Sequence, residues 1–541
     1  MWAVNPNRSR SGPGSRPARG KGLRRLWSSL CLAAVLGLPA AVRAFGFDDL
    51  AARAAVLAGQ PAASPSRPLP PALAALDYDG YRDIRFRPDR ALWRRDRLPF
   101  ELQLFHRGKF ATDAVRLNQI VDGRVLPIGY DPADYDFGKN RLQPATWPDL
   151  GHAGFRVHSA LNSAAYKDEL IVFLGASYFR ALGRGQHYGL SARALAVDTA
   201  GAPAGQGEEF PRFTEFWIER PAPGADRLRV YALLESARLT GAYEFTVTPG
   251  EATTLDVRSR VLLRQGAAPP STLGIAPLTS MFLHGEIQPR VGDFRPEVHD
   301  SDGLAVATGG GEWLWRPLQN PVRPLVTSFA MRSPRGFGLM QRDRAFPSYE
   351  DTEARYDRRP SAWVEPVGDW GPGRVELVLL PTPDETNDNV VAYWVPERGP
   401  TAGSPLELRY RLHWQGDRWQ RPPTGWALQS RTGGSYTTPA PDERQFTVDF
   451  TGPALAALPT AGAVRAVVTT NGNGAVLEAH AYPFPADLDG TQAGPGATGP
   501  RWRMSLRVRQ RDPSRPVELR AFLAHDTHAL TETWTHVVPP R

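Results

Sequence analysis

Apolar and polar residues alternate with a period of two along many short segments of this 541-residue chain. Successive side chains of a β-strand point to opposite faces, so a segment of this kind buries one face and exposes the other. Turn residues separate the segments, and a single short helix is predicted, from Asp48 to Gly59. The clearest alternating sets are Leu255 and Val257; Leu408, Tyr410, Leu412 and Trp414; Phe446, Val448 and Phe450; and Trp502, Met504, Leu506 and Val508. The pattern predicts an all-β fold made of β-sandwiches.

One break in the alternation suggests a domain boundary. Residues 397–405 (ERGPTAGSP) have no periodicity and consist largely of turn-forming residues, which is typical of a linker. We therefore expect a large β-sandwich domain over residues 45–396. Residues 406–541 have the length and strand pattern of a smaller immunoglobulin-like sandwich.

The basic charge of the chain is concentrated at its N-terminus. The formal net charge is +8, and residues 1–44 hold eight Lys and Arg residues with no Asp or Glu. An apolar stretch, residues 26–38, and the small-residue sequence Val42-Arg43-Ala44 follow, so we predict an export signal cleaved after Ala44. The stretch is too short for a membrane anchor. Arg24-Arg25 leaves both the Sec and the twin-arginine routes open.

Removing this segment leaves 56 basic and 56 acidic residues, so the main reason to expect a nucleic-acid partner disappears. The only cysteine, Cys31, lies within the predicted signal. The mature chain therefore has neither a thiolate nucleophile nor a Cys-ligated zinc. Its histidines also lack the short spacings of zinc sites, and we predict no metal and no cofactor.

Two acidic clusters lie in a region rich in aromatic residues, at residues 297–303 (EVHDSDG) and 384–389 (DETNDN). Sugar sites combine aromatic rings, which stack on the sugar, with carboxylates, which bind hydroxyls or transfer protons. Asp and Asn also close ordinary turns, so each cluster taken alone is more typical of a solvated turn or loop. The motifs of serine hydrolases, zincins and P-loop proteins do not occur.

Several long stretches, however, resemble one family. They are LGASYFR (174–180), YGLSARALAVDT (188–199), EEFPRFTEFWIERP (208–221), GIAPLTSMF (274–282), GEWLWRPLQNP (311–321), RPSAWVEP (359–366) and DETNDNVVAYW (384–394). Over essentially the whole mature chain the sequence resembles the periplasmic glucan biosynthesis proteins G and D. Residues 213–221 and 385–389 are more similar to the G branch.

The resemblance implies a galactose-mutarotase-like sandwich followed by an immunoglobulin-like domain. It also implies a role in making osmoregulated periplasmic glucans, whose backbone is β-1,2-linked glucose. Members resemble inverting endo-β-1,2-glucanases, with Asp388 matching the general acid and Asp300 the general base, which acts through a relay of hydroxyls and water. The expected substrate-binding or relay residues are Tyr356, Arg359, Thr386, Glu385, Trp363, Asp302 and His299.

Three functions remain open at this point. The protein hydrolyses β-1,2-glucan, transfers its segments as a transglycosylase, or only binds and guides glucan that leaves an inner-membrane glucan glucosyltransferase. The oligomeric state, including a homodimer, also stays open. The presence of both Asp300 and Asp388 favours an enzyme.

Overall fold

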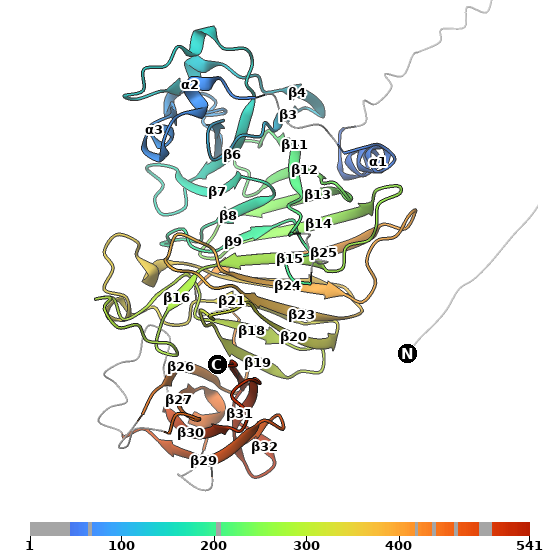
Figure 1. Ribbon diagram of the computed structural model, residues 1–541. Coiled ribbons are helices and arrows are strands. Elements are labelled where there is room, and N and C mark those ends of the chain that lie inside the picture. Colours follow the sequence, from blue (N-terminus) through green and yellow to red (C-terminus); the bar gives the residue numbers. More distant parts are fainter. Residues whose placement is uncertain are drawn as a thin grey trace, which may run out of the picture. The chain divides into compact units, whose positions relative to one another are not determined.

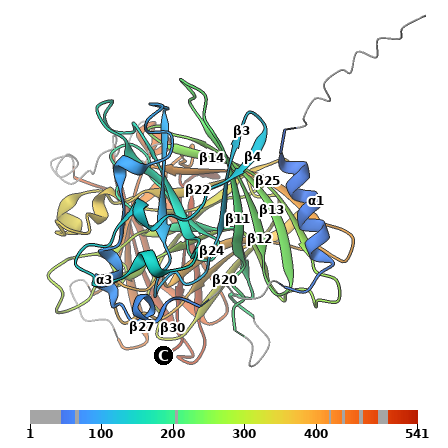
Figure 2. The same cartoon turned by 90° about the horizontal axis from the view of Figure 1, so that it is seen from above.

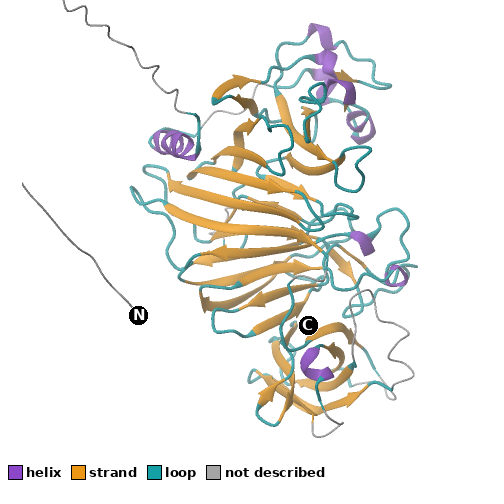
Figure 3. Cartoon of the chain, turned by 180° about the vertical axis from the view of Figure 1, so that it is seen from behind, coloured by secondary structure: helices purple, strands orange, loops and turns teal. Residues whose placement is uncertain are grey.

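Strands, most of them in antiparallel pairs, are the main regular structure of the chain, and helices are few, as the alternating sequence predicts (Figure 3). The computed structural model describes residues 44–62, 68–201, 207–416, 420–434, 440–458, 464–485 and 500–541. The predicted export signal therefore lies outside the described residues, except for Ala44. Within the described residues, no helix has both the length and the apolar composition that a membrane span requires.

One large sheet has ten strands and forms the first layer of a sandwich (Figure 1). Its order is β2-β6-β7-β8-β9-β15-β24-β23-β20, and β10 also pairs with β15. The strands are β2 (Phe100–His106), β6 (His152–Ser159), β7 (Asp168–Leu174), β8 (Tyr178–Ala181), β9 (Ser191–Arg193), β10 (Leu195–Val197), β15 (Leu273–Ser280), β20 (Leu325–Arg332), β23 (Pro372–Leu379) and β24 (Val390–Pro396).

The second sheet has fifteen strands in the order β28-β31-β33-β19-β18-β21-β22-β25-β14-β13-β12-β11-β3-β4, with β32 paired to β31. The strands are β3 (Arg116–Val121), β4 (Arg124–Pro127), β11 (Arg212–Glu219), β12 (Leu228–Glu235), β13 (Leu239–Thr248), β14 (Thr253–Leu263), β18 (Gly303–Ala307), β19 (Trp313–Pro317), β21 (Gly336–Met340), β22 (Ser361–Val367), β25 (Leu406–Gln415), β28 (Val464–Thr470), β31 (Val517–His525), β32 (His528–Ala529) and β33 (Thr533–Val538).

The core lies between the two sheets, where their inward side chains meet. β14 is buried at every second residue along its whole length, which is the physical counterpart of its sequence alternation. In the neighbouring β13, Phe245 packs against Phe173 of β7 with ring centroids 5.4 Å apart. Phe179 of β8 and Trp414 of β25 make a second contact across the layers at 5.9 Å. These contacts confirm the predicted large sandwich.

The expected linker joins the two sheets of the same sandwich. Residues 397–405 connect β24 in the first sheet to β25 in the second. β25 pairs with β14 on one side and with β22 on the other, so it is a central strand of the large sandwich. The chain therefore leaves this sandwich after Gln415, later than expected, because alternation identifies a strand but not its partner.

The C-terminal strands form a smaller two-sheet sandwich. A four-stranded sheet has the order β26-β27-β30-β29. Its strands are β26 (Trp426–Thr432), β27 (Glu443–Thr451), β29 (Gly474–Pro483) and β30 (Trp502–Gln510). The opposing layer is made by β28, β31 and β33, and β33 pairs in parallel with β19 of the large sandwich. Main-chain hydrogen bonds thus link the smaller sandwich directly to the second large sheet.

Helices are short and lie outside these sheets. They are α1 (Phe47–Ala58), α2 (Pro71–Ala74), α3 (Tyr78–Arg82), α4 (Pro453–Ala456) and the 3₁₀ helices η1 (Pro88–Arg90), η2 (Pro132–Asp134), η3 (Pro144–Thr146), η4 (Phe346–Ser348) and η5 (Tyr356–Arg358). Two-stranded ribbons pair β1 (Arg85–Phe86) with β5 (Tyr135–Asp136) and β16 (Phe282–His284) with β17 (Val298–His299).

The predicted N-terminal helix is α1, which lies against β12 and β13 (Figure 2). It buries Leu50 and Ala54 in a cluster with Trp217 and Tyr231. Its N-terminal cap differs from the expected Asp48, because the Asp49 carboxylate accepts the Gly46 N–H at 2.9 Å.

Candidate functional site

Hydrogen bonds to the backbone of Met281 and Phe282 bring the two predicted acidic clusters together. Asp300 follows β17 and donates its backbone N–H to the Met281 carbonyl over 2.9 Å. The Asn389 side chain accepts the N–H of the next residue, Phe282, at 2.8 Å and donates to its carbonyl at 3.0 Å. Because Asp388 directly precedes Asn389, the two Asp residues flank the start of β16, although they are far apart in the sequence.

Asp300 is a buried carboxyl group held against a cation. Only 4% of its surface is exposed, and Nη1 of Arg359 donates to its Oδ1. Burial raises the pKa of Asp300, Arg359 lowers it, and the charge of Asp388 raises it. The two carboxyl groups are therefore close enough to interact, and Arg359 favours the ionised form of Asp300.

Asp388 is the solvent-exposed member of the pair. Its Oδ2 lies 3.6 Å from Nη2 of Arg180, which comes from β8 in the first sheet. The charge of Arg180 also lowers the pKa of Asp300, so this side chain interacts with both carboxyl groups. No predicted site included Arg180, although it is the last residue of LGASYFR, one of the stretches that resemble the family.

Tyr356 and Glu385 belong to a network next to this pair. The buried Tyr356 hydroxyl donates to Oε2 of Glu385 at 3.1 Å, and the guanidinium of Arg359 lies 4.1 Å from the centroid of the Tyr356 ring. Burial raises the pKa of Tyr356, which keeps the phenol protonated. Arg295 donates to the same Glu385 oxygen at 2.7 Å and to Asp351 at 3.1 Å. Arg295, which the sequence analysis missed, thus connects the 384–389 loop to the loop that precedes η5.

His299, which is buried, and Asp302, which is partly buried, flank Asp300 in the sequence and hold the surrounding chain in place. His299 is fully buried, with Nε2 2.8 Å from Glu297 and Nδ1 3.0 Å from Gln341, and burial lowers its pKa. Asp302 accepts the backbone N–H groups of Arg342 and Asp343 at 2.9 and 3.0 Å. These bonds hold the chain in place on either side of Asp300.

Two predicted site residues point elsewhere. Trp363 of β22 is 2% exposed and stacks on Trp313 of β19 with ring centroids 5.6 Å apart. Its indole fills the core, so the structure does not present it to a sugar. Thr386 is exposed, and its backbone N–H donates to the Asp384 carboxylate of the same loop at 2.9 Å. The Thr386 hydroxyl donates to the same carboxylate at 2.5 Å, so it is bonded within its own loop.

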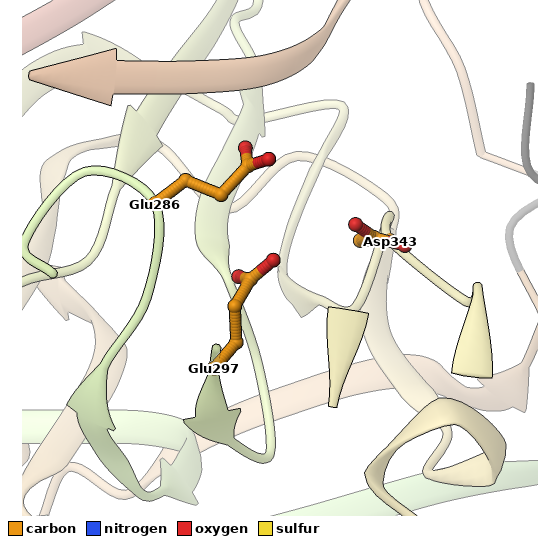
Figure 4. Close-up of side chains that lie close together, drawn as sticks. All are labelled: Glu286, Glu297 and Asp343. Carbon is orange, nitrogen blue, oxygen red and sulfur yellow. The ribbon is translucent and has the colours of Figure 1, made fainter. Parts of the chain in front are cut away.

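A third set of carboxylates lies nearby. Within the described part of the chain, Glu286, Glu297 and Asp343 are the group whose ligand atoms lie close enough to hold a metal ion, within 4.8 Å of one another (Figure 4). Each already has a hydrogen-bond partner: Arg431 for Glu286 at 2.8 Å, His299 for Glu297 at 2.8 Å, and Ser348 for Asp343 at 2.7 Å. Burial raises the pKa of both Glu286 and Glu297.

The fold and this site together define a β-sandwich protein with two interacting carboxyl groups set among arginines and a tyrosine. Its sequence identifies the family: the chain belongs to the family described as "Periplasmic glucan biosynthesis protein, MdoG", which matches residues 45–538.

Close relatives cover nearly the whole chain. A "Glucans biosynthesis protein G" from Ralstonia nicotianae is 52% identical over 92% of this chain and 97% of its own length. Proteins of the same description from Pseudomonas putida and Pseudomonas paraeruginosa are 47% and 46% identical, over 91% and 92% of this chain and 87% and 94% of their own lengths. The resemblance predicted from the sequence motifs is confirmed, and the chain has a role in periplasmic glucan biosynthesis.

Proposed function

We propose that this protein is an inverting endo-β-1,2-glucanase that acts in the biosynthesis of osmoregulated periplasmic glucans. One observation carries the proposal: Asp300 and Asp388, from distant segments, flank the same two backbone residues and interact electrostatically. Glycosidases use two carboxyl groups in this way, one as acid and one as base.

The environments of the two groups support different roles. Asp388 is exposed, so a glucan chain can reach it, and it donates its proton to the glycosidic oxygen as the bond from that oxygen to the anomeric carbon breaks. Asp300 is buried and ion-paired with Arg359, which stabilises its ionised form, and in that form it accepts a proton from the attacking water. The oxygen of that water forms the new bond on the opposite face of the sugar, which inverts the anomeric carbon.

A relay is needed because Asp300 is buried. The proton from the water reaches it through water molecules and sugar or protein hydroxyls, and the neighbouring Tyr356 hydroxyl, held by Glu385, orients this path. Arg359 contacts both Tyr356 and Asp300 and keeps the base fixed relative to the phenol.

Release of reducing ends from linear β-1,2-glucan tests the proposal. Asp388→Asn and Asp300→Asn keep the shape of each side chain but remove its proton transfer, so cleavage should fall by about 10² to 10⁴. Asp384→Asn, in the same exposed loop as Asp388, is the matched control and should retain cleavage. A wild-type protein that releases no reducing ends would contradict the enzyme proposal.

The second candidate is a glucan-binding protein that guides the polymer from an inner-membrane glucosyltransferase. The ion pair between the buried Asp300 and the partly buried Arg359 favours it, because two groups that neutralise each other also serve a site that only binds glucan. Complementation of a glucan-deficient strain separates the two: restoration of glucan by both Asn variants would favour binding. A transglycosylase would use the same acid and transfer the chain to a sugar hydroxyl instead of water, giving longer products without new reducing ends.

A further inference from the structure

A cavity of about 870 Å³ lies apart from the Asp300 and Asp388 pair. Three parts of the chain supply most of its lining: residues 286–297, residues 340–348, and β26 of the smaller sandwich with its flanking residues. Ser361 and Arg501 also line it. Neither Asp300 nor Asp388 is among its lining residues. Its volume falls within the range of pockets that hold small molecules or oligomer segments.

The lining combines acidic and basic groups in close pairs. Glu286 accepts from Arg431 of β26 at 2.8 Å, and Arg295 donates to Asp293 at 3.0 Å. Figure 4 shows three of its carboxylates, Glu286, Glu297 and Asp343, turned toward a common space. The carboxylates repel an anionic ligand, and the guanidinium groups repel a cationic one. The neutral hydroxyls of a sugar can instead donate to carboxylates and accept from guanidinium groups.

Two aromatic rings complete this lining. Trp426 of β26 is partly exposed, with the guanidinium of Arg421 4.7 Å from its ring centroid. Phe294, on the opposite segment, is 79% exposed. Aromatic rings beside paired polar groups are suited to the apolar face of a sugar ring.

We propose that this cavity is a second glucan-binding site, which holds a segment of the neutral polymer away from the cleavage point. The identity of the sugar rests on the function proposed above. Arg295 connects the two sites, because it lines the cavity and also donates to Glu385 in the network next to Asp300. A long chain therefore engages both sites, while a short one occupies only one of them.

Calorimetric titration of the full mature chain with β-1,2-glucooligosaccharides of increasing length tests this inference. The Asp300→Asn background prevents turnover. Affinity should rise once the oligosaccharide is long enough to span both sites. Trp426→Ala should remove that gain, about tenfold, while leaving the affinity for the shortest binding oligosaccharide unchanged.

Two further variants keep the test decisive. Phe294 is so exposed that Phe294→Ala should leave folding intact, and it should lower long-chain affinity in the same direction as Trp426→Ala. Tyr166→Ala, at a 58% exposed aromatic residue that does not line the cavity, is the matched control and should bind like the parent. Equal long-chain affinity of the parent and both cavity variants would overturn the inference.

The outcomes also separate this inference from the proposed enzyme. If the cavity variants weaken long-chain binding although the wild type releases no reducing ends, the second site stands and the glucanase proposal fails. If the wild type cleaves glucan but the cavity variants bind normally, the second site alone fails. A calcium-dependent rise in Tm that Glu286→Gln abolishes, together with unchanged glucan affinity in Trp426→Ala and Phe294→Ala, would instead assign the cavity to a cation.

Discussion

Replacing Arg359 with Gln removes the cation that faces the buried carboxyl group of Asp300. Burial raises the pKa of Asp300 and Arg359 opposes that rise, so in the variant the pKa should move further upward. An opposite charge in direct contact shifts a carboxyl pKa by roughly 1–3 units, which sets the size of the effect. Asp300 must be ionised to act as a base, so the acid limb of the pH–activity profile should move to higher pH by about the same 1–3 units.

The assay is reducing-end release from β-1,2-glucan across a pH series. Below the displaced limb the variant should be about 10 to 1,000 times slower than the wild type, and it should recover as the pH rises. A purely structural role for Arg359 would lower activity equally at every pH. Arg358→Gln, at an exposed neighbour in η5, is the matched control and should keep the wild-type profile.

The same upward change in the pKa of Asp300 should also alter how protein stability depends on pH. A carboxyl group whose pKa is higher in the folded than in the unfolded state favours folding at low pH, and that contribution is lost as the pH rises through the folded-state pKa. The Tm of Arg359→Gln relative to the wild type should therefore fall with increasing pH. Superimposable pH–activity profiles of Arg359→Gln and the wild type would refute the reasoning.

Four other predictions follow from the structure and the sequence. Trp363→Ala should lower the free energy of unfolding by about 3–5 kcal/mol, measured by urea denaturation, because the indole is buried against Trp313; a change in glucan affinity without loss of stability would contradict this. Thr386→Val should leave glucan cleavage within about twofold of the wild type, since Thr386 is exposed and bonded within its own loop. A loss comparable to that of Asp388→Asn would show that Thr386 takes part in the proton relay. Dialysis against a chelator should leave Tm and activity unchanged, and a loss reversed by a divalent ion would point to Glu286, Glu297 and Asp343. N-terminal sequencing of periplasmic material should begin at or near Phe45, and a mature chain that retains Arg24-Arg25 would exclude the predicted cleavage.

The all-β class could be predicted from the sequence because alternation is a local property. In β14, the residues that alternate in the sequence are the ones that alternate in burial. The partner of a strand is set by contacts between distant segments, which no local pattern encodes. For this reason β25 was expected in the C-terminal domain, whereas it pairs with β14 and β22 in the large sandwich.

The candidate site divides in the same way. The sequence alone determined which segments carry the chemistry, since the clusters at 297–303 and 384–389 and the family resemblance identified Asp300 and Asp388. Only the tertiary structure brought those two residues to β16, placed Arg180 beside Asp388, linked Arg295 to Glu385, and buried Trp363 in the core. The reason is that charge interaction and burial depend on distance through space, and in a sandwich of long-range strand pairs that distance is set by the fold rather than by separation along the chain.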